Sequence, residues 1–226
     1  MSPRGEGALQ PVLARYSRLV HERGWVANHD GNLSVRLADD RRFLATPTAL
    51  SKRDVEPHDL VIVDIEGKVL SGRRRIFSEW HLHAACYRAR PDVRAVLHAH
   101  PPHATAFGLA RTPLGTPALP EMVVSLGANI PLLDLAMPRS ASQDDAIRVA
   151  LTEGDADAML LAGNGVVVVG QDLEQAYLRL ELVEHYAKIF TAARALGGVT
   201  PLAHGDVEKL LEARTKAGLG KRARGV

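Results

Sequence analysis

The sequence has a single cysteine, Cys86, among its 226 residues. A lone cysteine excludes an intramolecular disulfide framework and is compatible with a reducing compartment. No apolar run approaches the roughly 18 residues that a membrane-spanning helix needs, and residues 1–6 do not open like a signal peptide. We therefore expect a cytoplasmic protein that has no membrane partner.

The chain also lacks a strong excess of either charge. It has 28 Lys and Arg against 26 Asp and Glu, a net charge of +2, which does not favour nucleic acid as a partner. Basic residues gather only locally, at residues 73–75 and in the tail at 221–224. We expect residues 218–226 to be a flexible, solvated tail. The arginines at 73–75 either belong to a solvated loop or lie beside a site, where they would attract an anionic substrate.

Several common catalytic motifs are absent: the sequence contains no P-loop, no H-E-x-x-H, no G-x-S-x-G and no paired C-x-x-C. The glycines at 163, 165 and 170 do not have the spacing of a dinucleotide-binding fingerprint. Hydrophobic residues make up 46% of the chain and charged residues 24%, which are ordinary globular values. Without repeats, linkers or low-complexity segments, residues 1–226 are expected to form one domain.

Hydrophobic periodicity predicts an α/β protein. Two hairpins come first, and helices then alternate with strands, which indicates a mixed, mainly antiparallel central sheet flanked by helices. The expected helices cover residues 9–24, 78–90, 143–152, 173–196 and 205–217, with a short one from 103. The expected strands cover residues 33–37, 42–46, 60–65, 68–70, 93–97, 158–161 and 166–169.

The most informative stretch is His98-Ala99-His100, which follows the apolar run at residues 93–97 and precedes Pro101-Pro102. Residues two apart on a strand point to the same side, so both imidazoles would project together where the prolines end the ladder. Two such histidines could hold two corners of a metal coordination sphere. The alternative is a pair of surface or hydrogen-bonded histidines.

Glu79 is expected near the start of a helix that Ser78 caps and Pro91 ends. A carboxylate near two histidines can complete a ligand set or act as an acid–base group, whereas the simpler alternative is a glutamate that only complements the helix dipole. His81 and His83 are two apart on this helix and face different ways. His83, four residues after Glu79, could orient it, but a packed or solvent-facing histidine is the simpler interpretation for both.

Several motifs, taken in order, resemble the class II aldolase/adducin family. They cover roughly residues 8–212 and read Asp30-Gly31-Asn32-Leu33-Ser34-Val35-Arg36, Thr46-Pro47-Thr48-Ala49-Leu50-Ser51-Lys52, Ser78-Glu79-Trp80-His81-Leu82-His83, Arg90-Pro91-Asp92-Val93 continuing to His98-Ala99-His100-Pro101, Gly163-Asn164-Gly165, and the helix that begins Leu173-Glu174-Gln175-Ala176. Each motif alone is weak, but several in the right order are strong support.

The resemblance implies a homotetrameric metal enzyme with a three-layer fold that acts on small sugar phosphates. Such enzymes cleave a carbon–carbon bond through a metal-stabilised enediolate, and their relatives epimerise, dehydrate or decarboxylate. By resemblance, His98 and His100 would bind Zn2+, and Glu79 would be the acid–base residue close to the metal. The substrate phosphate would lie in a pocket formed by Asn32, Thr48, Ala49 and Ser78.

The chain departs from the family pattern at three places. Asn164 stands where the third zinc histidine is expected, so the site could hold zinc, prefer Mn2+ or Co2+, or hold no metal, and His103 could compensate. Ala49 replaces a glycine and Phe77 a serine of the phosphate pocket, which makes a non-phosphorylated or aromatic substrate conceivable. Glu121 stands where aldolases have a tyrosine proton donor.

Two other functions fit the same residues. A decarboxylase or epimerase would use the same enediolate chemistry, and a non-catalytic, adducin-like assembly module would keep the fold with a degraded metal site. Asn164 and Ala49 favour the assembly module. Glu79, His98 and His100 favour an enzyme, because a decayed site has no physical reason to keep an acid and two ligands in register.

Overall fold

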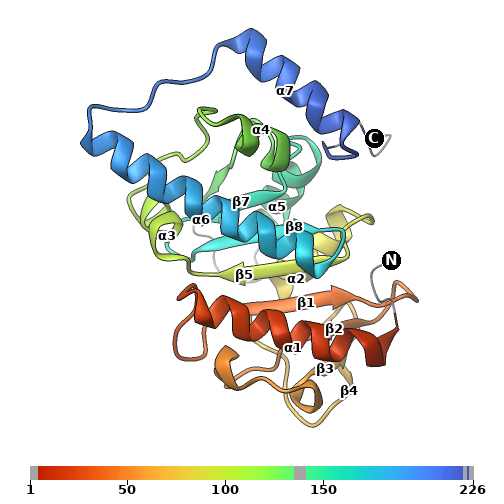
Figure 1. The fold of residues 1–226 in the computed structure, drawn as a ribbon. Helices are drawn as coiled ribbons and strands as arrows, with labels where there is room; N and C mark the ends of the chain where they lie inside the picture. Colours follow the sequence, from red (N-terminus) through yellow and green to blue (C-terminus); the bar gives the residue numbers. More distant parts are fainter. Residues whose placement is uncertain (1–4, 135–140, 221–222, 224–226) are drawn as a thin grey trace.

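The strands of the protein form one mixed sheet (Figure 1). The structure is a computed structural model that describes residues 5–134, 141–220 and 223. The strand order is β4-β3-β2-β1-β5-β8-β7-β6. Within the described residues only the β6–β7 pair is parallel. The strands are β1 (Asn32–Arg36), β2 (Phe43–Ala45), β3 (Val61–Val63), β4 (Val69–Ser71), β5 (Ala95–Ala99), β6 (Leu132–Leu133), β7 (Ala158–Leu161) and β8 (Val166–Gly170). The expected α/β class and mainly antiparallel sheet are confirmed.

Helices cover both faces of the sheet and make three layers. One face packs against α1 (Glu6–Glu22), α3 (Pro102–Leu109), α4 (Pro120–Leu126) and α6 (Leu173–Ala195). The opposite face packs against α2 (Trp80–Ala89) and α5 (Ala141–Thr152). In Figure 1, α1 and α6 cross the sheet on the side toward the viewer. The last helix, α7 (His204–Lys216), packs on α4.

The alternation of side chains along β5 determines what each face of the sheet receives. Leu97 points to the α6 face, whereas Val96 points to the α2 face, and both are fully buried. His98 continues the series of Val96, so it points toward the layer that contains α2. The apolar run before the histidines is therefore buried on both sides, as expected for a central strand.

Some elements differ from the sequence-based expectation. The sequence pattern did not predict α4, β6 or the 3₁₀ turns η1 (Lys52–Asp54) and η2 (Pro57–Asp59), which are too short for a periodic signal. The expectation that Ser78 caps the helix is wrong. Helix α2 begins at Trp80 with Glu79 at the N-cap position, and no side chain caps it.

The ends of the chain and its lone cysteine can be placed in part. None of the described helices is long and apolar enough to cross a membrane. Cys86 is buried in α2, and burial raises the pKa of its thiol to about 12, which suits a packing residue. Of the expected tail, Gly220 is buried close to Arg214, while residues 221, 222 and 224–226 lie outside the described part of the chain.

Candidate functional site

The candidate site lies where β1, β5 and the start of α2 meet. The antiparallel register of β1 and β5 places Asn32 directly opposite His98. His98 is completely buried and Asn32 is 3% exposed. Because both face the α2 layer, they meet the residue that precedes that helix, Glu79. The sheet therefore brings together three residues that the sequence singled out and that lie far apart along the chain.

The Glu79 carboxylate is held by two side chains and faces a third. Its Oε1 accepts a hydrogen bond from Asn164 Nδ2 at 2.9 Å, and its Oε2 accepts one from Asn32 Nδ2 at 2.9 Å. Its Oε1 also lies 3.4 Å from His98 Nε2. These hydrogen bonds fix the carboxylate. The side chain of Glu79 is 29% exposed, so it still reaches solvent.

This environment keeps Glu79 ionised. Burial by itself would raise its pKa. The interaction with His98 and the hydrogen bonds from Asn164 and Asn32 outweigh burial, so the pKa of Glu79 is held well below its usual value.

The two predicted histidines are oriented in the same way. His98 Nδ1 donates to the backbone oxygen of Val166 at 3.0 Å, and His100 Nδ1 lies 3.2 Å from Asp30 Oδ2. The Nε2 atoms of both rings are buried and have no hydrogen-bond partner among the described residues. A ring fixed through Nδ1, with Nε2 left free, is the usual arrangement of a metal-ligating histidine.

A shared cation would resolve the contact between His98 and Glu79. A neutral His98 with its proton on Nδ1 would present a lone pair at Nε2, and the facing carboxylate oxygen is also an acceptor. The 3.4 Å between these atoms would allow both to be ligands of one metal ion. Burial lowers the pKa of His100, which favours the neutral form of its ring.

Asn164 lies in the turn between β7 and β8, next to these groups. Gly165 has a φ of +71°, and a Cβ atom there would lie 2.3 Å from both Ala99 O and His100 Cδ2. Only glycine allows this close approach of the turn to His100. Among the described residues, no cluster of three or more His, Cys, Asp or Glu side chains is arranged to hold a metal ion. Any metal set here therefore includes the amide of Asn164 or water.

Two segments that carry expected phosphate-binding residues are joined by backbone contacts. Pro47 forms an isolated β-bridge with Ile76, and the backbone N–H of Thr48 donates to Arg75 O at 3.0 Å. This contact places Arg75 beside Thr48, two residues before Phe77, whereas the neighbouring Arg74 pairs with Asp59 at 2.7 Å. Ala49 and Ser78 are exposed. Both polar atoms of the Asn32 side chain are engaged by Glu79 and His83, so its assignment to the phosphate pocket stays a prediction.

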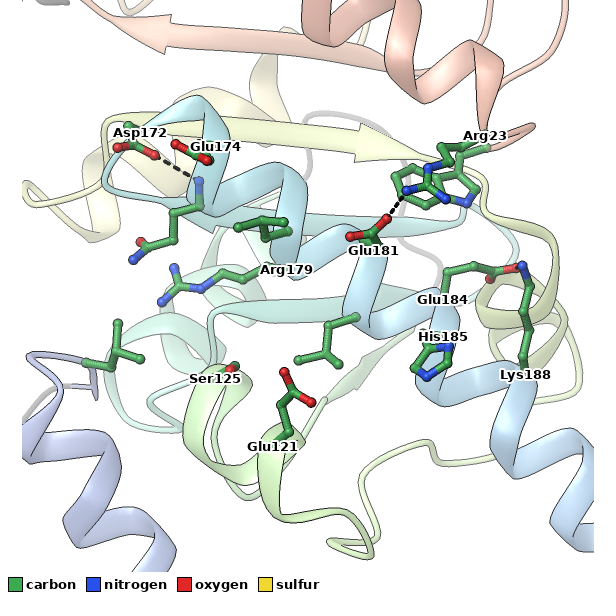
Figure 2. Close-up of a pocket in the computed structure, with 15 residues that line it drawn as sticks. Arg23, Glu121, Ser125, Asp172, Glu174, Arg179, Glu181, Glu184, His185 and Lys188 are labelled. Atoms are coloured by element: carbon green, nitrogen blue, oxygen red, sulfur yellow. Dashed lines mark hydrogen bonds and ion pairs between the residues drawn. The ribbon is translucent and has the colours of Figure 1, made fainter. Parts of the chain in front are cut away.

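Three other candidates have partners elsewhere. His103 Nδ1 lies 2.9 Å from Glu184 Oε1, so His103 is not turned toward His98 and His100. His81 Nε2 lies 3.2 Å from Gln143 Oε1 of α5. Glu121, at the start of α4, lines a cavity of about 790 Å³ beside α6 (Figure 2). That cavity contains none of the residues that surround Glu79.

The sequence indicated no role for Asp30 or Lys52, which lie near the site, and it left two interpretations for His83. Asp30 orients His100, and Lys52 donates from Nζ to His29 O and Leu50 O at 3.2 Å each. Both belong to motifs that carried the family resemblance, which was the available signal. His83 does not contact Glu79 directly but reaches it through Asn32, to which it bonds at 2.6 Å.

Comparison with known proteins identifies the family. The family described as Class II Aldolase and Adducin N-terminal domain matches residues 12–191. A 3-oxo-tetronate 4-phosphate decarboxylase of Haemophilus influenzae is 34% identical over 189 residues, which is 81% of this chain and 87% of the relative. A 5-methylthioribulose-1-phosphate/5-deoxyribulose-1-phosphate aldolase of Rhodospirillum rubrum is 32% identical over 205 residues, 91% of this chain and 90% of the relative.

A solved structure gives the same result. An L-fuculose 1-phosphate aldolase superimposes with a TM-score of 0.80 at 29% identity, covering 90% of this chain and 94% of the other. Class II aldolases depend on a divalent metal ion and act on small molecules. The chain belongs to the class II aldolase and adducin family and is a lyase of the class II aldolase type.

Proposed function

We propose that this protein breaks the carbon–carbon bond between the α and β carbons of a small sugar phosphate or related hydroxy-carbonyl compound, which leaves an enediolate. One observation carries the proposal. The fixed, ionised carboxylate of Glu79 lies 3.4 Å from the Nε2 atom of His98, and the Nε2 atoms of His98 and His100 are both buried without a partner among the described residues. An acid–base group beside two free imidazole nitrogens suits a metal-dependent lyase.

The proposed ligands of the divalent metal are His98, His100 and Glu79, with the weaker amide of Asn164. At least one of these side chains must move to complete the set, because among the described residues they do not form a three-ligand cluster as they stand. Zn2+ is the first candidate, and Mn2+ or Co2+ also suit a set with more oxygen donors. When bound, such a cation acts as a Lewis acid and stabilises the negative charge that bond cleavage leaves on the substrate.

Glu79 is the proposed acid–base residue. Its carboxylate is ionised at rest, so it is ready to accept a proton at one of its oxygens and to return it to carbon. Asn32 and Asn164 hold the two oxygens from opposite sides, which keeps the carboxylate oriented during the transfer.

The proposed substrate carries a phosphate group. Thr48, Ala49 and Ser78 would form its pocket together with Asn32, and the exposed Arg75 beside Thr48 would add positive charge there. The relatives named above act on phosphorylated compounds. Decarboxylation is the second candidate reaction, because a decarboxylase is among these relatives at 34% identity and also breaks a carbon–carbon bond.

The remaining features are proposed on the family resemblance. We infer that the chain is one domain, that it works as a homotetramer and that it is located in the cytoplasm. These proposals are compatible with the single sheet and with the low cysteine content.

Metal analysis and activity assays test this function together. Protein purified without chelator is expected to contain a divalent metal, and it should cleave 5-deoxyribulose 1-phosphate or fuculose 1-phosphate, or decarboxylate 3-oxo-tetronate 4-phosphate. Glu79→Gln is expected to lower kcat at least about 100-fold, since general acid–base groups contribute about that much. His100→Ala should lose metal.

A matched control is His204→Ala, because the side chain of His204 is 90% exposed on α7. This variant should keep both the metal and the activity. Full activity in Glu79→Gln, or an active wild-type protein that is free of metal, would contradict the proposal.

A further inference from the structure

A continuous chain of buried hydrogen bonds leads from Glu79 into the core. Tyr87 Oη lies 2.8 Å from Ser34 Oγ, and Ser34 Oγ lies 2.7 Å from His83 Nδ1. His83 Nε2 lies 2.6 Å from Asn32 Oδ1, and Asn32 Nδ2 donates to Glu79 Oε2 at 2.9 Å. Ser34 and His83 are completely buried, Tyr87 is 2% exposed and Asn32 is 3% exposed.

The chemistry of these groups allows one direction for every bond. Ionised Glu79 only accepts, so Asn32 must turn its N–H to the carboxylate and its carbonyl to His83. His83 must then donate from Nε2, which leaves Nδ1 to accept from the Ser34 hydroxyl. The Ser34 oxygen in turn accepts from the Tyr87 hydroxyl. All four donors therefore point toward Glu79.

Burial keeps the two titratable members of the chain in the required form. Burial lowers the pKa of His83 to about 3, so its ring carries a single proton. Burial raises the pKa of Tyr87, so its phenol remains a donor. The ring of His83 also packs against Phe77 and Trp80, with centroids 4.9 Å and 6.0 Å away, which limits its rotation.

We propose that His83, supported by Ser34 and Tyr87, is a positioning residue for Glu79 and acts through Asn32. It selects the orientation of the Asn32 amide in which the N–H, and not the carbonyl, faces the carboxylate. If the amide were free to rotate by half a turn, its carbonyl oxygen would face the Glu79 oxygen. Two acceptors repel each other, and the carboxylate would move away from His98.

The effect of this positioning on catalysis rests on the proposed function. The direction of the hydrogen bonds from Tyr87 to Glu79 does not. The first test therefore needs no substrate. In wild-type protein labelled with 15N at histidine, the side-chain NMR spectrum of His83 should show the neutral tautomer protonated at Nε2. A ring protonated at Nδ1, or an imidazolium at pH 7, would overturn the proposal.

The second test compares two substitutions of similar volume in the metal-loaded enzyme. His83→Leu fills the space but has no donor, whereas His83→Gln offers an amide N–H to Asn32. With 5-deoxyribulose 1-phosphate as the probe and the metal at saturation, His83→Leu is expected to lower kcat about 10- to 100-fold, with KM within about threefold of wild type. His83→Gln should restore most of this loss. Equal impairment of both variants, or a wild-type kcat in His83→Leu, would overturn the proposal.

Tyr87→Phe keeps the test decisive if His83→Leu does not fold. It removes only the hydroxyl at the far end of the chain and leaves the ring packed. We expect a loss in kcat of about two- to fivefold and a measurable change in the His83 NMR signals. Unchanged signals would show that the chain does not act as a unit and would overturn the proposal. If the wild-type protein turns over neither 5-deoxyribulose 1-phosphate, fuculose 1-phosphate nor 3-oxo-tetronate 4-phosphate, the proposed function fails. The NMR result alone then decides this inference.

Discussion

Ala49 has a φ of 56°, in the left-handed region that residues with a Cβ atom rarely occupy. It follows Thr48 in the turn after β2, where the family resemblance implies a glycine. The Cβ atom costs roughly 1–2 kcal/mol in this conformation. The chain thus carries local strain in the proposed phosphate pocket.

Ala49→Gly should therefore stabilise the protein. Relief of the strain exceeds the extra conformational entropy of glycine in the unfolded chain, which costs about 0.4–1 kcal/mol, so we expect a gain of about 0.5–1 kcal/mol in the free energy of unfolding. Urea denaturation measures it. The control is Ala106→Gly on the exposed side of α3, where the same change should cost up to about 1 kcal/mol. A loss of stability at position 49 would contradict the strain.

Asn164 is the second residue whose identity matters by itself. An amide oxygen is a weaker ligand for zinc than an imidazole nitrogen, so Asn164→His is expected to strengthen zinc binding. Zinc retained after dialysis against a chelator is the measurement. Gln171→His adds a histidine at an exposed position and should leave zinc retention unchanged. Equal retention in wild type and Asn164→His would show that position 164 does not face the metal.

At the scale of elements, Lys52 joins the turn before β1 to the turn after β2. Its ammonium group donates to backbone oxygens of His29 and Leu50, and the residue is only 2% exposed. Burial lowers its pKa to about 8, although the negative charges of Asp30 and Glu79 act in the opposite direction. The two turns that carry Asp30 and Thr48 are therefore linked by one buried cation.

This burial predicts a specific pH dependence of stability. Lysine in the unfolded chain has a pKa of about 10.4, so between pH 8 and that value the unfolded state binds more protons than the folded state. The contribution of Lys52 to the free energy of unfolding should rise with pH across this window, by about 1.4 kcal/mol per unit of pKa difference.

Urea denaturation at several pH values between 7 and 10 measures this contribution as the difference between wild type and Lys52→Met. The difference should shift in favour of wild type as the pH rises. Lys216→Met, at an exposed position at the end of α7, is the control and should follow wild type at every pH. A pH-independent difference between wild type and Lys52→Met would contradict the prediction.

At the scale of the whole molecule, one buried carboxylate connects both helical layers and the C-terminal helix. Asp157 is completely buried just before β7. It bonds Arg90 at the end of α2 and Arg179 of α6 at 2.6 Å each, and also Arg214 of α7. Burial would raise the pKa of Asp157, but the charges of these three arginines hold it below its usual value. Segments far apart in sequence thus depend on one residue.

Asp157→Asn should strongly destabilise the fold. The substitution leaves three buried guanidinium groups without their shared anion, and breaking such a cluster typically costs about 3–5 kcal/mol. The melting temperature and urea denaturation measure this loss. Asp134→Asn is the matched control, because Asp134 pairs with Arg111 at a position where its side chain is 84% exposed. It should change stability by less than about 1 kcal/mol. Similar small losses in both variants would contradict the proposed role of the cluster.

Periodicity predicted the type of most elements, because strand and helix periodicities are local. Alternation along β5 was enough to predict that His98 and His100 share a side, and the motif order was enough to recognise the family. The position of Glu79 near a helix start was also predicted, but Ser78 as its cap was not correct. Short elements such as α4 carried too few residues for a periodic signal.

The contacts within the site were decided only by the tertiary structure. The register that pairs Asn32 with His98 and brings Asp30 to His100 depends on the packing of both strands, and no local pattern encodes it. The same is true of Asn164, which reaches Glu79 from a turn 85 residues later, and of the arginines around Asp157. Local chemistry selects which residues can react, while long-range packing decides which of them meet.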